Sequence, residues 1–101
     1  MRRYAGCVML FALLAGPATA ATDCSRPNKS SIDMMLCSND KLALADNIMA
    51  RAFRDAFNRT ERREALIEDQ ERWRKTVRDA CKDVPCLMRA YQDRTSELDT
   101  W

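Results

Sequence analysis

Apolar residues recur at every third or fourth position through three stretches of the chain, which is the period of an amphipathic helix. The first stretch consists of Leu42, Ala45, Ile48, Met49, Ala52, Phe53 and Ala56. The second consists of Leu66, Ile67, Trp73, Val77, Ala80 and Cys81, and the third of Leu87, Met88, Tyr91, Thr95 and Leu98. No segment shows the period of two that a half-buried strand requires. The pattern therefore predicts an all-α protein.

Residues that favour helix ends divide this pattern into elements. Ser30 or Ser31 is a suitable N-cap for a short helical turn, and Thr60 is a suitable N-cap for the next long helix. Pro85 interrupts the preceding helix and suits the first turn of a new one. We therefore expect an irregular arm at 21–30 and then helices at about 31–37, 39–58, 61–82 and 86–99.

The first twenty residues have the three parts of a secretory signal peptide. Arg2 and Arg3 precede an apolar stretch at 7–15, and an A-x-A sequence ends at Ala20. The apolar stretch is much shorter than the roughly 20 residues that span a bilayer. We expect removal of residues 1–20 after Ala20, which leaves one exported domain at 21–101. The mature protein is expected to be periplasmic or secreted, without stable insertion into a membrane.

Charge and composition restrict the classes of function. Without residues 1–20, the chain has 15 basic and 15 acidic side chains, so its formal net charge is zero. A protein without net positive charge lacks the main electrostatic attraction for nucleic acid. The chain has no histidine, no G-x-S-x-G motif and no phosphate-binding loop. The sequence therefore predicts neither an enzyme nor a metal or cofactor site.

The four cysteines that remain are Cys24, Cys37, Cys81 and Cys86. Redox pairs favour a two-residue spacing at a helix N-terminus, whereas Cys81 closes a predicted helix. A zinc site rarely forms from four scattered thiols in an oxidising compartment. Structural disulfides are the better interpretation. Three pairings are possible, and the energies of loop closure do not choose between them. Because Cys81 and Cys86 flank one tight break, we favour the local pairs Cys24–Cys37 and Cys81–Cys86. The predicted fold is a small disulfide-stapled bundle or hairpin of about three helices with a short N-terminal helical turn.

The ordered segments "SIDMMLCSNDKLALAD" (31–46), "QERWRKTVRDAC" (70–81) and "CLMRAYQDRTSEL" (86–98) resemble the lysozyme inhibitor LprI family. Besides the cysteines and the 94–98 end, the residues that carry the resemblance are Leu42, Asp46, Gln70, Trp73, Arg78 and Asp79. The chain departs from the family pattern at Phe53, where tyrosine is expected, and at Thr95, where an aliphatic residue is common. The resemblance implies a small, helical, exported protein, and it implies lysozyme inhibition as an activity of some members.

Two functions follow as hypotheses. The first is inhibition of a lysozyme-type muramidase, in which a guanidinium reaches the catalytic carboxylates and occludes the active site. The candidates for that contact are Arg59, Arg62, Arg63, Arg89 and Arg94. The second is an envelope adaptor that binds another protein, with Trp101 as an anchoring side chain. The sequence does not rank these arginines, and it leaves the oligomeric state open.

The remaining aromatic and polar residues have simpler interpretations. We expect Trp73 to lie in the core, and Gln70 and Asp79 to pair across helices, Asp79 with an arginine. A third hypothesis, binding to a membrane surface, requires an exposed apolar patch formed by Phe53, Phe57 and the neighbouring Met34 and Met35.

Overall fold

The computed structural model of the protein describes residues 21–101. The predicted signal peptide at 1–20, with its cleavage after Ala20, lies outside the described residues. The elements are α2 (Ser31–Ser38), α3 (Asp40–Arg59), α4 (Arg63–Trp73), the π-helical turn η2 (Arg74–Arg78) and α5 (Val84–Leu98). Within 21–101 all regular structure is helical, which confirms the predicted all-α class.

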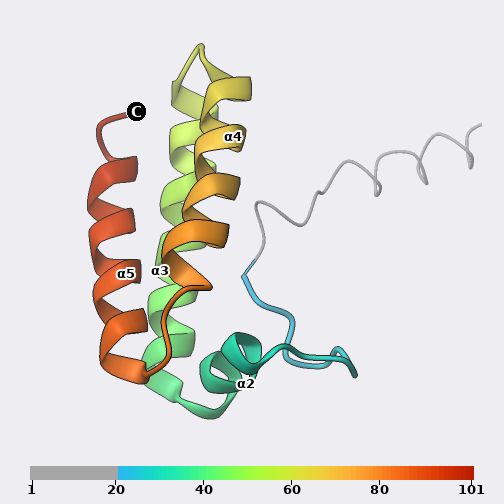
Figure 1. Ribbon diagram of the computed structural model, residues 1–101. Helices are drawn as coiled ribbons and strands as arrows, with labels where there is room; N and C mark the ends of the chain where they lie inside the picture. Colours follow the sequence, from blue (N-terminus) through green and yellow to red (C-terminus); the bar gives the residue numbers. More distant parts are fainter. Residues whose placement is uncertain (1–20) are drawn as a thin grey trace, which may run out of the picture.

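The three long helices lie lengthwise beside one another, and the short helix α2 lies across one end of them (Figure 1). The turn between α3 and α4 lies at the opposite end, where the C-terminus also arrives. Residues 59–63 and the last residues of the chain are therefore neighbours in space, although they are almost 40 positions apart in sequence.

Side chains at the N-caps start three of the helices. The Ser30 hydroxyl accepts the backbone N–H of Asp33 at 3.1 Å. Asn39 accepts the N–H groups of the next two helical residues with one side-chain oxygen. Asp83 accepts the N–H of Cys86 at 2.9 Å, and Pro85 stands in the first turn, where its missing N–H costs nothing. This cap starts α5 at Val84, two residues earlier than the pattern predicts.

The break between α3 and α4 differs from its prediction. Thr60 is the C-cap of α3, where its N–H donates to the carbonyl of Ala56 at 2.9 Å, so its prediction as an N-cap is wrong. Its hydroxyl instead accepts the N–H of Arg62 at 3.1 Å across the turn. The next helix begins only at Arg63. Thr60 is buried and fixes a tight connection between the two helices.

The helix predicted at 61–82 ends early. After Trp73 the backbone widens into η2, and Asp79 donates to the carbonyl of Arg74, five residues back, at 2.9 Å. The chain then leaves the helix before Cys81. The disulfide between Cys81 and Cys86 explains this end, because Cys86 already belongs to the first turn of α5 and the backbone must reverse before it.

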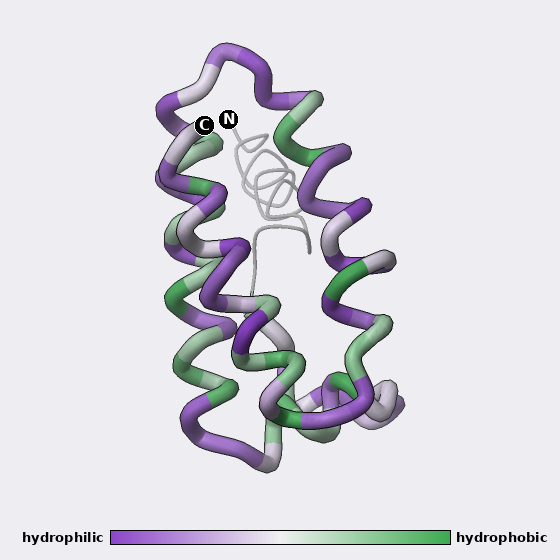
Figure 2. Tube along the Cα trace, turned by 60° about the vertical axis from the view of Figure 1, so that its left-hand side comes forward, coloured by the Kyte–Doolittle hydropathy of each residue, from purple (hydrophilic) through white to green (hydrophobic). Residues whose placement is uncertain are grey.

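The core lies between α3 and α5 and is closed by residues from α2 and α4. Its fully buried large side chains are Tyr91, Phe53, Leu36, Leu42, Leu66, Leu87 and Leu98. Trp73 is buried as expected, and its ring meets that of Tyr91 edge-on at 5.3 Å between centroids. Figure 2 shows hydrophobic positions interspersed among hydrophilic ones along the helices, in keeping with the helical period of the sequence.

Some apolar positions of the predicted stripes are exposed instead. Ile48, Ile67 and Val77 have 44%, 40% and 44% of their surface accessible. The periodic stripes are therefore wider than the faces that the neighbouring helices cover.

The apolar patch that membrane binding requires is also absent from the described part of the chain. Phe53 is fully buried and Phe57 and Met35 are half-buried, so Met34 alone of the four is exposed. No helix within 21–101 has the length and apolar character needed to cross a bilayer.

The first prediction concerns the packing of α3. We expect Phe53→Ala to lower the free energy of unfolding by about 3–5 kcal/mol, because it leaves a cavity at a fully buried position. Ile48→Ala is the control on the same helix and should cost less than about 1 kcal/mol, since Ile48 is largely exposed. Urea unfolding followed by circular dichroism measures both values. Equal losses would show that α3 does not bury the face described here.

Candidate functional site

Two disulfides hold the end of the molecule at which α2 lies. One joins Cys24 of the arm to Cys37 of α2, and the other joins Cys81 to Cys86 across the turn into α5. Their Cα–Cα distances are 5.6 and 5.5 Å. These are the local pairs that the sequence analysis favoured.

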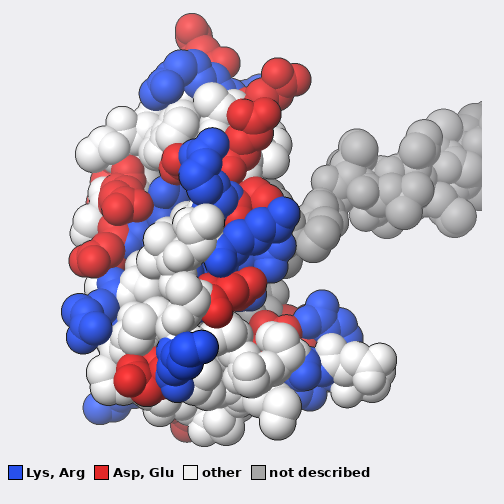
Figure 3. All heavy atoms as spheres, in the orientation of Figure 1, with Lys and Arg blue, Asp and Glu red and all other residues white. Residues whose placement is uncertain are grey.

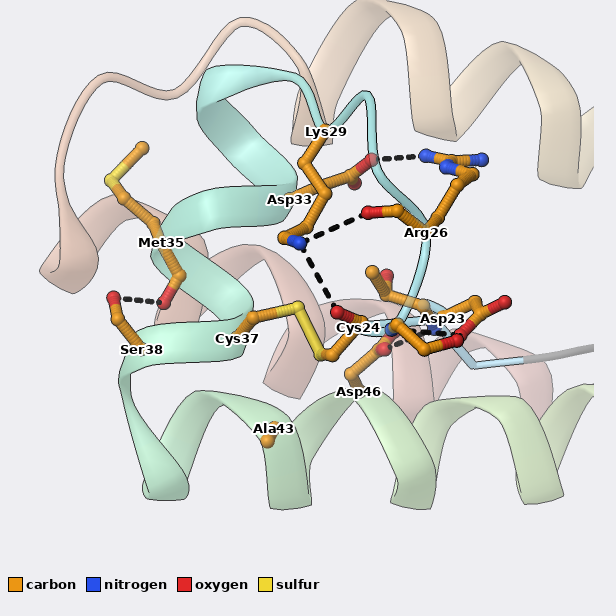
Figure 4. Close-up of a disulfide and its surroundings, with 12 residues drawn as sticks. Asp23, Cys24, Arg26, Lys29, Asp33, Met35, Cys37, Ser38, Ala43 and Asp46 are labelled. Atoms are coloured by element: carbon orange, nitrogen blue, oxygen red, sulfur yellow. Dashed lines mark hydrogen bonds and ion pairs between the residues drawn. A yellow bond between two sulfur atoms is a disulfide. The ribbon is translucent and has the colours of Figure 1, made fainter.

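The arm at 21–30 is irregular but is fastened at several points (Figure 4). The guanidinium of Arg26 pairs with Asp33 at 2.6 Å. The ammonium of Lys29 donates to the carbonyls of Cys24 and Arg26 at 3.1 and 3.0 Å. At the beginning of the arm, the backbone N–H of Thr22 donates to the carboxylate of Asp46 at 2.7 Å. The arm therefore lies against α2 and α3.

A polar cavity of about 740 Å³ lies between the arm, α3 and the α4–η2 segment, and we call it the arm cavity. Its carboxylates are Asp23, Asp33, Asp46, Glu71 and Asp79, and its guanidiniums are Arg26, Arg74 and Arg78. Gln70 and Trp73 also line it. Five of the six residues that carry the family resemblance therefore meet at one cavity, and only Leu42 lies in the core instead. Spacing alone gives no indication of this convergence, because it depends on the arm.

The inner wall of the arm cavity contains a buried polar cluster. Asp46 is buried, and the side chain of Arg78 is only 12% exposed, between Asp79 at 2.9 Å and Asp33 at 4.0 Å. The Tyr91 hydroxyl lies beside Asp46 and Arg78, although it makes no hydrogen bond of regular geometry with a described residue. Burial raises the pKa of Tyr91 and the charge of Asp46 raises it further, whereas Arg78 opposes the change. The phenol therefore stays neutral far into the alkaline range.

Arg94 has a different place from the one that the partner-contact hypothesis gave it. Its side chain is 3% exposed, so it is no surface contact. Its Nε donates to Gln70 at 2.8 Å, and its Nη1 donates to Asp69 at 2.8 Å and to Glu97 at 3.2 Å. The Gln70 amide donates in turn to the sulfur of Met49 at 3.2 Å. This chain of contacts joins α5, α4 and α3.

The other polar prediction holds in part. Gln70 connects helices as expected, whereas Asp79 pairs with Arg78 and Arg74, both from the adjacent η2. Asp79 therefore stabilises the π-helical turn and does not join separate helices.

Three of the candidate arginines and Trp101 meet at the far end of the bundle, which we call the arginine end (Arg59, Arg62, Arg63 and Trp101). Arg59 donates to the carbonyl of Leu98 at 2.9 Å. Arg63 donates to the carbonyl of Phe57 at 2.8 Å and lies over the ring of Phe57 at 5.1 Å. The guanidinium of Arg62 lies 4.6 Å from the ring of Trp101. Carbonyls and rings thus orient the three guanidiniums, and none forms an ion pair with a carboxylate of residues 21–101.

Most other arginines pair with carboxylates, whereas the exposed Arg51, Arg54 and Arg89 form no ion pair within residues 21–101. Figure 3 shows basic and acidic side chains interleaved over the visible face. On α4 and η2, for example, Arg72 pairs with Asp69 and Arg74 pairs with Glu71. Arg89 is exposed in the first half of α5, a helix whose last residues lie at the arginine end. Among the candidates, the structure therefore brings together Arg59, Arg62, Arg63 and Trp101, and it separates Arg89 and Arg94 from them.

A shallow depression between α3 and α5 has a different character. Its volume is about 450 Å³, and it includes the exposed Leu44 and Ile48 together with Met88. The sequence pattern placed Ile48 and Met88 only on the apolar stripes of their helices, so it gave no indication of this surface. No group of three His, Cys, Asp or Glu residues within 21–101 is arranged to hold a metal ion.

Residues 21–101 thus define a small all-α protein that is closed by two disulfides and has three oriented arginines together at one end. The chain belongs to the lysozyme inhibitor LprI family, because residues 22–98 match the model of the family described as Lysozyme inhibitor LprI. This confirms the resemblance carried by the cysteines and the segments between them. No curated protein and no solved structure gives a significant match to the chain.

The second prediction concerns Arg94. Arg94→Met keeps the apolar stem but leaves the buried Gln70 carbonyl without its donor, which should lower the free energy of unfolding by about 1–3 kcal/mol. Arg72→Met is the matched control, because Arg72 pairs with the same Asp69 from an exposed position and should cost less than about 1 kcal/mol. Chemical unfolding of the two variants makes the comparison. Similar values for both would contradict the bridging role of Arg94.

The third prediction concerns pH. Tyr91 has a raised pKa in the fold, so the unfolded chain loses its phenol proton first, near the ordinary pKa of about 10. Above that pH the native state binds more protons than the unfolded state, and stability must fall as pH rises.

Tyr91 is the one tyrosine of residues 21–101, so phenolate absorbance of this domain reports it alone. The absorbance should appear together with unfolding and not before it. Tyr91→Phe, which removes the titrating hydroxyl, should abolish this part of the alkaline loss of stability. A normal phenolate titration in the folded protein would contradict the burial of this group.

Proposed function

We propose that this protein is an exported inhibitor of a lysozyme-type muramidase and that the arginine end occupies the active-site cleft of the enzyme. Membership of the lysozyme inhibitor LprI family supports the class of target. The observation that carries the site is the set of three oriented guanidiniums without acidic partners at one end of the bundle. The other arginines of α4 and η2 already have carboxylate partners.

The chemistry of the target fits this end of the molecule. A muramidase holds two carboxyl groups across a sugar-binding cleft, one of them ionised during catalysis. A guanidinium presents a planar set of N–H donors that matches a carboxylate in two-point contact. Arg59 and Arg63 each use one donor on a backbone carbonyl, so their remaining donors are free to bind a partner.

Preorganisation supports the same site. The turn is fixed by Thr60, which is buried and bonds to both sides of it. Arg59 also ties α3 to the last turn of α5. A partner therefore meets side chains that are already oriented, which reduces the entropy lost on binding. The half-buried Trp101 adds apolar contact beside the guanidinium of Arg62.

The export that this function requires is part of the proposal. The predicted signal peptide at 1–20 and the two disulfides are both typical of a protein that acts outside the cytosol. The partner is a protein, and the proposed mode of action needs no cofactor.

A second candidate is an envelope adaptor that binds another protein and has no effect on muramidases. The depression between α3 and α5 favours it, since Leu44 and Ile48 expose apolar surface that the fold does not use. The two candidates place the contact on different faces, so one pair of variants separates them.

The fourth prediction tests the arginine end. We expect Arg62→Gln with Arg63→Gln to weaken inhibition of a muramidase at least about tenfold, since one charged hydrogen bond contributes about 1.5–3 kcal/mol. The control is Arg51→Gln with Arg89→Gln, which removes the same charge from exposed arginines elsewhere and should change inhibition less than about twofold. Lysis rates with animal and bacterial-type muramidases give the inhibition constants, and calorimetry with the enzyme alone shows that the protein binds the enzyme and not its substrate.

Three results would decide against the proposed site. No inhibition and no binding of any muramidase at tens of micromolar would remove the inhibitor function and leave the adaptor. Equal losses of inhibition in both double variants would show that the arginines act only through the net charge of the protein and not through a specific contact. Loss of binding in Ile48→Arg, with the arginine variants intact, would move the contact to the α3–α5 depression.

A further inference from the structure

The arm cavity contains more negative than positive side chains. Five carboxylates and three guanidiniums line it, and two of the carboxylates, on Asp33 and Asp46, are buried. Asp33 is paired with Arg26 and lies 4.0 Å from Arg78. Asp46 has no ion pair with any described residue; the backbone amide of Thr22 donates to it at 2.7 Å, and the neutral Tyr91 hydroxyl lies beside it. Both of these neighbours are neutral, and a buried carboxylate is better stabilised by a positive charge than by neutral donors alone.

The first described residue lies beside this carboxylate. Ala21 lines the arm cavity and is partly buried. Standard bond lengths place the nitrogen of Ala21 within about 4 Å of the nitrogen of Thr22, which is 2.7 Å from the Asp46 carboxylate. Whatever group the nitrogen of Ala21 carries is therefore held next to Asp46.

The expected cleavage after Ala20 changes that group. Hydrolysis of the Ala20–Ala21 peptide bond adds water across it, so Ala20 leaves as a carboxylate and the nitrogen of Ala21 becomes an ammonium at neutral pH. One amide N–H is thereby replaced by three donors and a positive charge. We propose that this new α-ammonium docks in the arm cavity as the counter-ion of Asp46, so that removal of the signal peptide completes the fold.

The disulfide of the arm supports this assignment. The bond from Cys24 to Cys37 and the contacts of Lys29 hold the arm against α2, and the bond from Thr22 to Asp46 places its first residues beside α3. The ammonium therefore loses little further conformational freedom when it pairs with Asp46. Asp46 is one of the residues that carry the family resemblance, and a carboxylate at this position can accept both the Thr22 amide and a neighbouring cation.

The proposed ion pair makes the folded domain more stable after cleavage than before it. Before cleavage, Asp46 lacks its counter-ion and the arm is held less firmly to α3. After cleavage, the mature chain gains an ion pair that the precursor does not form. The folded state is thus most stable in the form that has already crossed the membrane.

The experiment compares three oxidised forms of the domain, which begin with free Ala21, with N-acetylated Ala21 and with Ala20. Acetylation removes the charge, and the extra alanine displaces it by one residue. We expect both changes to lower Tm by roughly 4–8 °C, the scale of one lost interaction in a domain of this size. In Asp46→Asn, acetylation should shift Tm by less than about 2 °C. In Asp55→Asn, an exposed control on the same helix, the full shift should remain.

A second measurement uses the unaltered sequence, in case Asp46→Asn does not fold. An ion-paired α-ammonium has a raised pKa, so acylation of the Ala21 amine at neutral pH should be about tenfold slower in the folded than in the urea-unfolded chain. Mass spectrometry of the N-terminal peptide gives both rates. Equal rates, equal Tm values for the free and acetylated forms, or an exported protein that begins at a residue other than Ala21 would each overturn the proposal.

Discussion

The fold depends on covalent closure at one end of a bundle whose apolar core is small. A domain of about 80 residues buries too little surface to be stable with a wide margin, and disulfides commonly supply the difference. Here both bridges lie where the chain changes direction, one between the arm and α2 and one between η2 and α5. The opposite end has no bridge and is held by the buried Thr60 and by the bond from Arg59 to the Leu98 carbonyl. Covalent closure and candidate contact surface are thus at opposite ends.

The sequence pattern predicted the helical class and the approximate helices, and it favoured the disulfide pairing that the structure has, because these depend largely on local chemistry. Apolar period and N-capping residues such as Ser30 are properties of neighbouring positions, and Cys81 and Cys86 flank one break. The early end of the second long helix was not predictable, since η2 is set by a bridge to the following helix. The exposure of Ile48 was likewise missed, because the helical period gives the direction of a side chain but not the area that its neighbours cover.

The positions of the candidate site residues were likewise predictable only where the residues are close in sequence. Arg59, Arg62 and Arg63 are close in sequence at one turn, so their common position could be anticipated, whereas the arrival of Trp101 required the direction of α5. Arg94 is indistinguishable in sequence from an exposed helical arginine, and only the fold reveals that it faces Gln70. The convergence of Asp46 and Arg78 on the arm cavity was hidden for another reason. An irregular arm has no period from which its path can be read.

The π-helical turn restricts how the length of this chain can change. A backbone bond that spans five residues accommodates one residue more than an α-helical turn, and it rotates everything after it relative to Trp73. That rotation brings the side chain of Arg78 inward to Asp33 and leads the chain out towards the bridge at Cys81. The number of residues between Trp73 and Cys81 therefore determines whether Arg78 and Cys81 reach their partners. Homologues that keep this geometry should tolerate exchange of residue types there more readily than the loss or gain of a single position.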